Sequence, residues 1–305
     1  MASLTSSSLS LPKHLASGIW QKATTGSTVA ALSGAEPMLF GETQLMTFTQ
    51  QPKAQFVAEG GTKSGSDVAF SSKTVVPRKV QVTLRFNQEV QWADEDYQLG
   101  VLSTLADATA GALSRALDLG IYHAINPLDG KALSGSPAKV LDTTNSVEIA
   151  TAGADMDFES AAGLVISDGY VPTGVALDPS YAWTLATARY TDGRKKFPDL
   201  GLGTNITSFQ GLNAAVSSTV SAPEATVSGG AYATTNPNVK AILGDFSQIR
   251  WGVQRRIGVE KIVYGNPDGL GDLKAQNQIA LRAEVVYGWA IMDTDAFAKI
   301  IDAVA

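Results

Sequence analysis

The sequence predicts an α+β fold, with one long helix and one long strand in the body and a hairpin that projects from it. Between residues 102 and 124, apolar side chains recur at helical spacing, which indicates a helix with one buried face. Between Ile279 and Ile291, apolar residues occupy every second position, which indicates a strand. The glycine-rich run Glu59–Asp67 lies between two strand-like segments and is typical of a hairpin tip.

The N-terminal part of the chain is mostly extended in character. Residues 1–12 are rich in Ser, Thr and Leu and predict an arm that does not fold alone. A short helix is expected from Pro12 to Lys22, because proline is tolerated in the first turn of a helix. The hairpin strands are expected at Ala54–Ala58 and Val68–Val76. Val80–Phe86 alternates apolar and polar residues, which predicts a half-buried strand.

The rest of the chain alternates short helices and strands around the two long elements. The long helix is expected to end near Asn126 and Pro127, since proline cannot continue it. Asp178 followed by Pro179 predicts the start of a helix, and Asp245 is placed to cap a further element. The other expected elements are a helix at Asp157–Ile166 and a strand at Thr173–Leu177.

The composition excludes several kinds of chemistry. The chain of 305 residues has no cysteine, so disulfides, zinc–thiolate sites, iron–sulfur clusters and thiol nucleophiles are excluded. Its two histidines, His14 and His123, are far apart in the sequence, and neither a metal nor a cofactor is expected. Only 17% of the residues are charged, which fits a subunit that buries much of its surface against neighbours and equally fits a Ser/Thr/Gly-rich β protein.

Charge and hydropathy argue against a nucleic-acid-binding or membrane protein. The net charge is −6, and the longest basic run is Arg194–Lys196. Proteins that bind the phosphates of nucleic acids usually have a basic face instead. No apolar run approaches the ~20 residues of a membrane span. The N-terminus lacks the cationic start and apolar core of a signal peptide, so the chain is expected in the cytoplasm of the cell that makes it.

Two short motifs favour ordinary structural interpretations. Gly60–Ser64 is superficially like a phosphate loop, but its residue order differs and it lies between strand-like runs. Asn266–Asp272 could present oxygen atoms to calcium, yet its spacing departs from an EF-hand loop and no bidentate Glu follows. A hairpin tip and a turn are therefore expected. The residues show no active site, and projections that cannot bury their own apolar sides imply assembly with other chains.

Six stretches of the chain together carry a family resemblance. They are LPKHLASGIWQKATTGSTVAALSG, PKAQFVAEGGTKSGSDVAFSS, LADATAGALSRALDLGIYHAIN, GVALDPSYAWTLATARYTDGR, AILGDFSQIRWGVQRRIGVEKI and NQIALRAEVVYGWAIMDTDAFAKI. These stretches resemble, in the same order, parts of the major capsid proteins of tailed bacteriophages with the Hong Kong 97 fold. They cover most of the chain, and the ordered set is more specific than any one of them.

The resemblance implies a Hong Kong 97-like capsid fold with a long spine helix at about residues 94–126. The implied axial domain would meet its copies around fivefold and sixfold positions, which requires hinge-like freedom between lobes. The implied segments are an N-terminal arm at 1–45, an extended β-hairpin loop at 46–90, a peripheral domain with the spine helix at 91–145, an axial domain at 146–272 and the return strand of the peripheral domain at 273–305.

The resemblance also implies a structural function rather than an enzymatic one. The chain would assemble into hexamers and pentamers of an icosahedral shell that encloses phage double-stranded DNA without reading its sequence, and it would reside in the virion. A portal protein, with or without a decoration protein, would be a partner. The arm-like pattern begins almost at Met1, so a separate scaffolding protein, or none, is expected. The alternatives are an encapsulin-type bacterial nanocompartment shell and an unrelated soluble enzyme.

The resemblance suggests one chemical reaction, because some relatives join their subunits by a Lys–Asn isopeptide bond assisted by a Glu. Asn277 and Glu284 match the spacing of that motif, and Lys63 at the hairpin tip is the natural amine, with Lys73 as a substitute. In the alternative interpretation, which is favoured, Glu284 pairs with Arg282 or a neighbour's base, Asn277 caps a turn and Lys63 is solvated.

Overall fold

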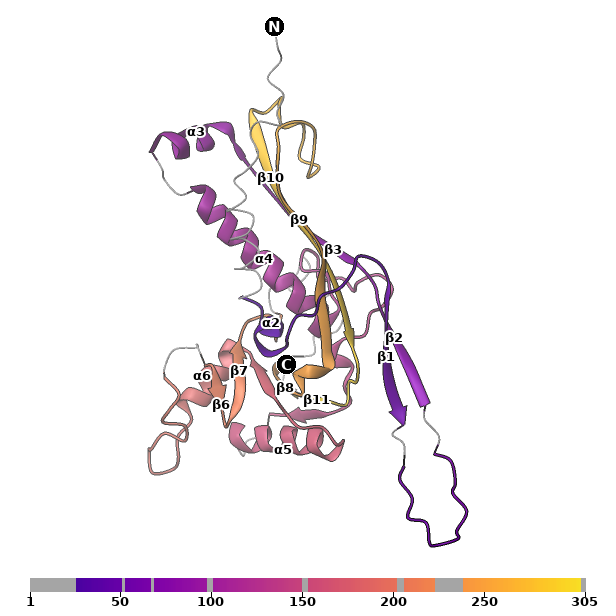
Figure 1. Ribbon diagram of the computed structural model, residues 1–305. Helices are drawn as coiled ribbons and strands as arrows, with labels where there is room; N and C mark the ends of the chain where they lie inside the picture. The colour runs from indigo at the N-terminus through magenta and orange to yellow at the C-terminus, as the bar shows by residue number, and fades with distance from the viewer. Residues whose placement is uncertain are drawn as a thin grey trace.

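The computed structural model describes residues 26–50, 53–66, 69–97, 101–149, 153–201, 206–222 and 238–302. The expected arm at 1–12 and the expected helix at Pro12–Lys22 lie outside this part of the chain. The described strands form a three-stranded, a six-stranded and a two-stranded sheet. Figure 1 shows a long helix beside the three-stranded sheet, the six-stranded sheet below them, and the two-stranded ribbon directed away from both.

The three-stranded sheet is antiparallel and has the long C-terminal strand at its centre. It consists of β3 (Arg78–Asn87), β10 (Gln278–Ile291) and β9 (Ile249–Ile262), in that order. Alternate residues of β10 enter the main core beside helical side chains, as the period-two pattern requires. The strands expected at Val80–Phe86 and Ile279–Ile291 are therefore confirmed.

The long helix α4 (Val101–His123) packs on this sheet through Ala and Leu residues, which are strong helix formers. The helix indicated by the apolar spacing between residues 102 and 124 is confirmed, whereas the longer helix implied by the resemblance, at about 94–126, extends beyond α4 at both ends. A separate, more polar helix, α3 (Gln88–Tyr97), precedes α4, because its sequence QEVQWADEDY lacks the apolar face that α4 presents to the sheet. At the other end α4 stops at His123 rather than at the proline, since Ala124 adopts a left-handed conformation with φ 54°.

The projecting hairpin has the second expected strand, at Val68–Val76, but its first strand lies earlier in the chain than expected. β1 (Thr43–Gln50) pairs antiparallel with β2 (Ala69–Val75), starting from Thr43 opposite Val75. Residues 53–58 are not a strand, so the expectation for Ala54–Ala58 is wrong. All of 53–66 is exposed, and a strand there would have no sheet face to pack against. The loop is instead closed by a hydrogen bond from Lys53 N to Ser66 Oγ (2.7 Å) and a turn from Gly61 N to Ala58 O (2.9 Å).

The six-stranded sheet has the order β4-β11-β8-β5-β7-β6. Helix α5 (Ala154–Ser167) and helix α6 (Pro179–Thr187) pack on it around a second core that includes Phe158, Leu185 and Leu243. The helix expected at Asp157–Ile166 and the strand expected at Thr173–Leu177 are both present. The Asp178 cap is confirmed because Asp178 Oδ1 accepts a hydrogen bond from Ser180 N at 2.8 Å. The strands are β4 (Ser146–Glu148), β5 (Gly174–Leu177), β6 (Ser208–Phe209), β7 (Leu212–Val216), β8 (Val239–Gly244) and β11 (Phe297–Ile301).

The chain crosses between the two larger sheets more often than the implied layout suggests. It leaves β8 through a short 3-10 helix, η3 (Phe246–Gln248), to form β9 in the three-stranded sheet, and it returns after β10 to form β11 in the six-stranded sheet. The implied boundary at residue 272 does not coincide with this pairing. β9 lies with the expected peripheral strands, and β11 lies with the expected axial ones. A shared core containing Leu117, Trp251 and Phe297 joins the sheets.

Candidate assembly surfaces

The hairpin carries large apolar side chains that are exposed in the described part of the chain. Met46 on β1 and Phe70 on β2 are mostly exposed, and Phe56 in the connecting loop is fully exposed. The body holds the root of the ribbon, where Val75 of β2 is fully buried and β2 contacts β10. An isolated two-stranded ribbon is only marginally stable in water. Exposed apolar side chains on an unpaired ribbon are the signature of a surface that packs on another chain.

The six-stranded lobe also exposes large apolar residues, which lie on its helices and the turn that follows α5. Trp183 on α6 is 50% exposed, and Met156 and Ile166 on α5 are exposed as well. Val171, in the turn after α5, is mostly exposed. Tryptophan is enriched where proteins contact each other, because it offers a large rigid surface. These exposed side chains make the lobe a second candidate for contact with copies of the chain.

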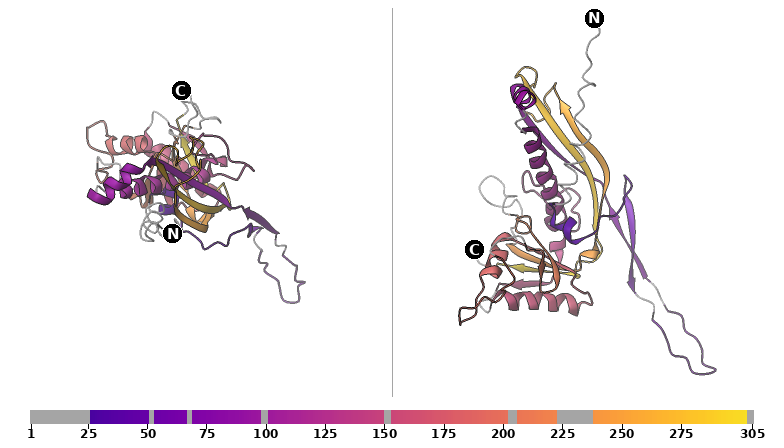
Figure 2. Two further views of the ribbon diagram at one scale, coloured as in Figure 1. Left: turned by 90° about the horizontal axis from the view of Figure 1, so that it is seen from above. Right: turned by 60° about the vertical axis from the view of Figure 1, so that its left-hand side comes forward.

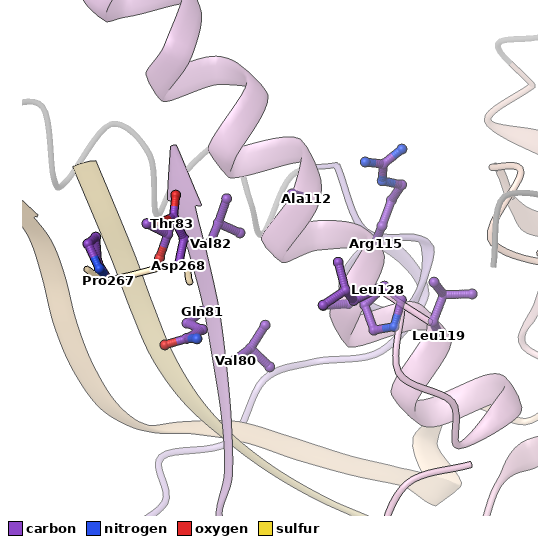
Figure 3. A pocket seen from close by; sticks show the side chains of 12 residues that line it. Val80, Gln81, Val82, Thr83, Ala112, Arg115, Leu119, Leu128, Pro267 and Asp268 are labelled. Atoms are coloured by element: carbon purple, nitrogen blue, oxygen red, sulfur yellow. The ribbon is translucent and has the colours of Figure 1, made fainter. Parts of the chain in front are cut away.

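A hollow of about 580 Å³ lies between β3 and α4 (Figure 3). Its walls are mostly aliphatic and include Val80 and Val82 from β3 and Ala112 and Leu119 from α4. Leu128, on the loop after α4, projects at its rim and is 91% exposed. This lining favours burial of apolar groups over acid–base chemistry.

The acid that lines the hollow, Asp268, belongs to an arginine network that folds the loop between β9 and β10. Arg85 donates from Nε to Asp268 Oδ2 (2.9 Å), from Nη1 to Gln276 Oε1 (3.0 Å) and from Nη2 to Gly271 O (2.9 Å). The hydrogen bond from Arg85 holds the pKa of Asp268 below its usual range.

The oxygens that the sequence could have offered to calcium are used within the same loop. Asn266 Oδ1 accepts from Gly271 N (3.1 Å), and Asp272 Oδ1 accepts from Ala275 N (3.0 Å). Groups of acids or histidines able to hold a metal are absent from the described residues. The segment is an ordinary turn.

The three residues of the cross-link hypothesis do not meet within one chain. Lys63 lies in the exposed hairpin loop. Asn277, with φ 54°, donates from Nδ2 to Glu89 Oε1 at 2.6 Å. Glu284 pairs with Lys79 Nζ at 2.8 Å across the β3–β10 ladder. Asn277 and Glu284 are seven residues apart, about 23 Å along an extended chain, so a bond would require groups from different subunits.

Within the subunit, the base that pairs with Glu284 is Lys79 and not Arg282. Arg282 does not pair with Glu284, because it donates to Thr83 Oγ1 (3.1 Å) and to Pro267 O (2.8 Å). Lys73, the substitute amine, lies on β2 opposite Leu45.

Sequence reasoning missed a buried polar cluster centred on Asp118 of α4. The Asp118 carboxylate accepts hydrogen bonds from Ser27 Oγ, from Thr28 N (3.0 Å) and Oγ1 (2.8 Å), from Val29 N (3.2 Å) and from Thr219 Oγ1 (2.8 Å). Burial raises the pKa of this carboxyl even though the donors act in the opposite direction. The only sequence signal was an acid within the apolar stretch ALDLGIYH.

His123 extends the same cluster at the end of α4. Its Nε2 lies 3.1 Å from Thr219 O and 3.0 Å from Val220 O, so a neutral imidazole donates there. Burial lowers the pKa of His123 from 6.5 to about 4.

We expect the fold to lose stability in acid through His123. Because the unfolded chain binds the proton near pH 6.5 and the folded chain only near pH 4, the free energy of unfolding should fall by about 3 kcal/mol between these pH values. Chemical unfolding at a series of pH values, compared with His123→Gln, isolates this contribution because Asp118 is common to both proteins. Equal pH dependence in the two proteins would contradict the assignment.

Comparison with known proteins decides the family. The pattern of the phage capsid family matches residues 8–301, nearly the whole chain. The chain belongs to the phage capsid family. It is a structural major capsid protein, its place is the virion capsid, and the alternative of an unrelated enzyme is excluded. No curated protein matches the chain. Among the described residues of this capsid protein, no helix is long and apolar enough to span a membrane.

Solved structures agree with this assignment over almost the entire capsid protein. A chain from Mycobacterium phage Ogopogo is 55% identical, with a TM-score of 0.83, and the match covers 99% of this chain and 100% of that one. A chain from Gordonia phage Cozz is 29% identical, with a TM-score of 0.75, over 92% and 87% of the two chains. The capsid of an empty GTA particle, at 12% identity and a TM-score of 0.63 over 92% and 90%, shares the fold. These neighbours support self-assembly into capsomers.

Proposed function

We propose that this capsid protein forms the hexamers and pentamers of an icosahedral shell around phage double-stranded DNA, and that its hairpin fastens each subunit to a neighbour. The observation that carries the proposal is the hairpin, which projects away from the two larger sheets (Figure 2) and carries exposed apolar side chains. Phe56 is fully exposed in the described part of its own subunit, and contact with a second copy would bury it.

The matching phage structures support a phage shell over a bacterial nanocompartment, because the chain from Ogopogo spans the full length of this one at 55% identity. A portal protein, packaged DNA and, in some shells, a decoration protein complete the proposed set of partners, with synthesis and assembly in the host cytoplasm. The net charge of −6 fits a wall that holds DNA without binding it tightly. A separate scaffolding protein belongs to this proposal.

The double substitution Phe56→Ser/Val57→Ser tests the hairpin directly, because it keeps the loop length and removes only exposed apolar groups. We expect an unchanged thermal midpoint of the unassembled chain, together with loss of closed shells in negative-stain electron microscopy and a shift to capsomers in sedimentation. Normal shells from the variant would contradict the role of the hairpin.

The unsubstituted chain, expressed alone, serves as the control for assembly. Shells or capsomers are expected from it, and capsomers without shells would indicate a need for scaffolding. A chain that stays monomeric at high concentration would contradict the proposed function as a whole.

We further propose that the shell wall is not covalently joined. Glu284 is already paired with Lys79, and Asn277 with Glu89, so neither is poised beside Lys63 in the subunit. Boiling mature particles in detergent should give a single band near 31.9 kDa. Ladders of larger bands that disappear in Lys63→Arg, Asn277→Asp or Glu284→Ala would show the isopeptide bond instead.

A further inference from the structure

The Asp118 cluster ties together three parts of the chain that are far apart in sequence. Asp118 belongs to α4, and four of its hydrogen bonds come from residues 27–29, at the start of the short helix α2 (Thr28–Leu32). A further one comes from Thr219, in the segment 217–222 that follows β7 of the six-stranded sheet. One fully buried carboxylate therefore receives donors both from the N-terminal segment and from the six-stranded lobe.

The next turn of α4 also bonds both the N-terminal segment and the 217–222 segment. Tyr122 Oη lies 3.0 Å from Thr28 Oγ1, which holds the N-terminal segment a second time. His123 holds the 217–222 segment through the carbonyls of Thr219 and Val220. Residues 118–123 of α4 thus present both attachments on little more than one helical turn.

The chemistry of Asp118 makes the two attachments depend on each other. An ionised carboxylate in the interior is costly unless hydrogen bonds replace its hydration. The donors that the structure shows are hydroxyl and backbone N–H groups rather than a cation, so the compensation is spread over both segments. If one segment leaves, the carboxylate loses part of that compensation, and water that reaches it also competes for the remaining donors.

We propose that Asp118 is a shared latch that couples the docking of the N-terminal segment at residues 27–29 to the docking of the 217–222 segment on α4. The N-terminal segment then does not detach independently of the six-stranded lobe. The chain switches between a state with both segments docked and one with both released. This coupling is a property of the single subunit, so a test of it does not depend on the proposed role of the hairpin.

Three matched Thr→Val substitutions test the coupling by amide hydrogen exchange of the full, unassembled chain. Thr219→Val removes one hydroxyl from the lobe side of the cluster, and Thr28→Val removes one from the N-terminal side. Thr143→Val is the control, because its buried hydroxyl donates to Phe297 O (2.7 Å) outside the cluster. All three changes preserve the shape of the side chain.

We expect Thr219→Val to speed exchange of the amides at residues 27–33 about tenfold, and Thr28→Val to do the same at 217–222, while Thr143→Val affects neither segment. Asp118→Asn should release both segments together. If each Thr→Val substitution speeds exchange only within its own segment, the latch is overturned. If either Thr28→Val or Thr219→Val does not fold, the other variant still tests the coupling, because it reports on the opposite segment.

Discussion

Trp251→Ala should lower the free energy of unfolding by about 3–5 kcal/mol, the range for removal of a large buried aromatic side chain. Trp251 is 1% exposed and lies in the core that joins the two larger sheets. Its indole N–H donates to the buried Ser33 Oγ at 3.0 Å, so the substitution leaves both a cavity and a lost hydrogen bond. Chemical unfolding of the unassembled chain measures the loss.

Trp183→Ala is the matched control for this experiment. Trp183 lies on α6 with half of its surface exposed, so its removal should cost only about 1 kcal/mol. Equal losses for the two tryptophans would contradict the placement of Trp251 at the junction of the sheets.

Gly244→Ala should destabilise the fold by about 3 kcal/mol, at the upper end of the usual cost of overpacking. A Cβ atom at this position would lie 2.3 Å from Ala296 O and 2.8 Å from Phe297 Cα, closer than real Cβ atoms approach other atoms. Both contacts are with backbone, so β8 and β11 would have to move apart where Gly244 faces Phe297. A drop in the thermal midpoint of the unassembled chain is the expected readout.

The same substitution at Gly163 should have the opposite sign. Gly163 lies within α5, its Cβ would meet nothing within 4 Å, and alanine favours the helix by about 0.5–1 kcal/mol. If Gly244→Ala were tolerated as well as Gly163→Ala, the close approach of β8 and β11 would be contradicted.

The helices and strands that could be predicted from the sequence are those whose pattern depends only on neighbouring residues. The alternation at Ile279–Ile291 and the Asp178–Pro179 start of α6 each depend on a few neighbouring residues, and the structure has both elements. The apolar spacing at 102–124 located α4, but the end expected near Asn126 and Pro127 lay too far along, because Ala124 already adopts a left-handed conformation. The first hairpin strand was misplaced, because the glycine-rich run marks only part of a longer loop, whereas the strand expected at Val68–Val76 is present as β2.

The polar contacts could not be predicted, because their partners are distant in sequence. Ser27 and Asp118 are 91 residues apart, and Thr219 lies 101 residues from Asp118. Glu284 pairs with Lys79 rather than the expected Arg282, because β3 places Lys79 diagonally opposite on the neighbouring strand. The resemblance to the capsid family supplied the function, and it could not supply these contacts.

The two short crossings between the larger sheets, from β8 to β9 and from β10 to β11, run side by side and are bonded to each other. Asp245 N donates to Ala296 O at 3.0 Å, and Met292 N donates to Gln248 O at 2.9 Å. The rings of Phe246 and Phe297 meet edge to face at this junction, with centroids 5.6 Å apart. A single strand of chain can swivel about its bonds, whereas a cross-bonded pair resists torsion as a ribbon does. In the proposed hexamers and pentamers, torque applied to one lobe by neighbouring subunits would therefore pass to the long sheet and helix, and the subunit would act as a lever rather than as two loosely tethered bodies.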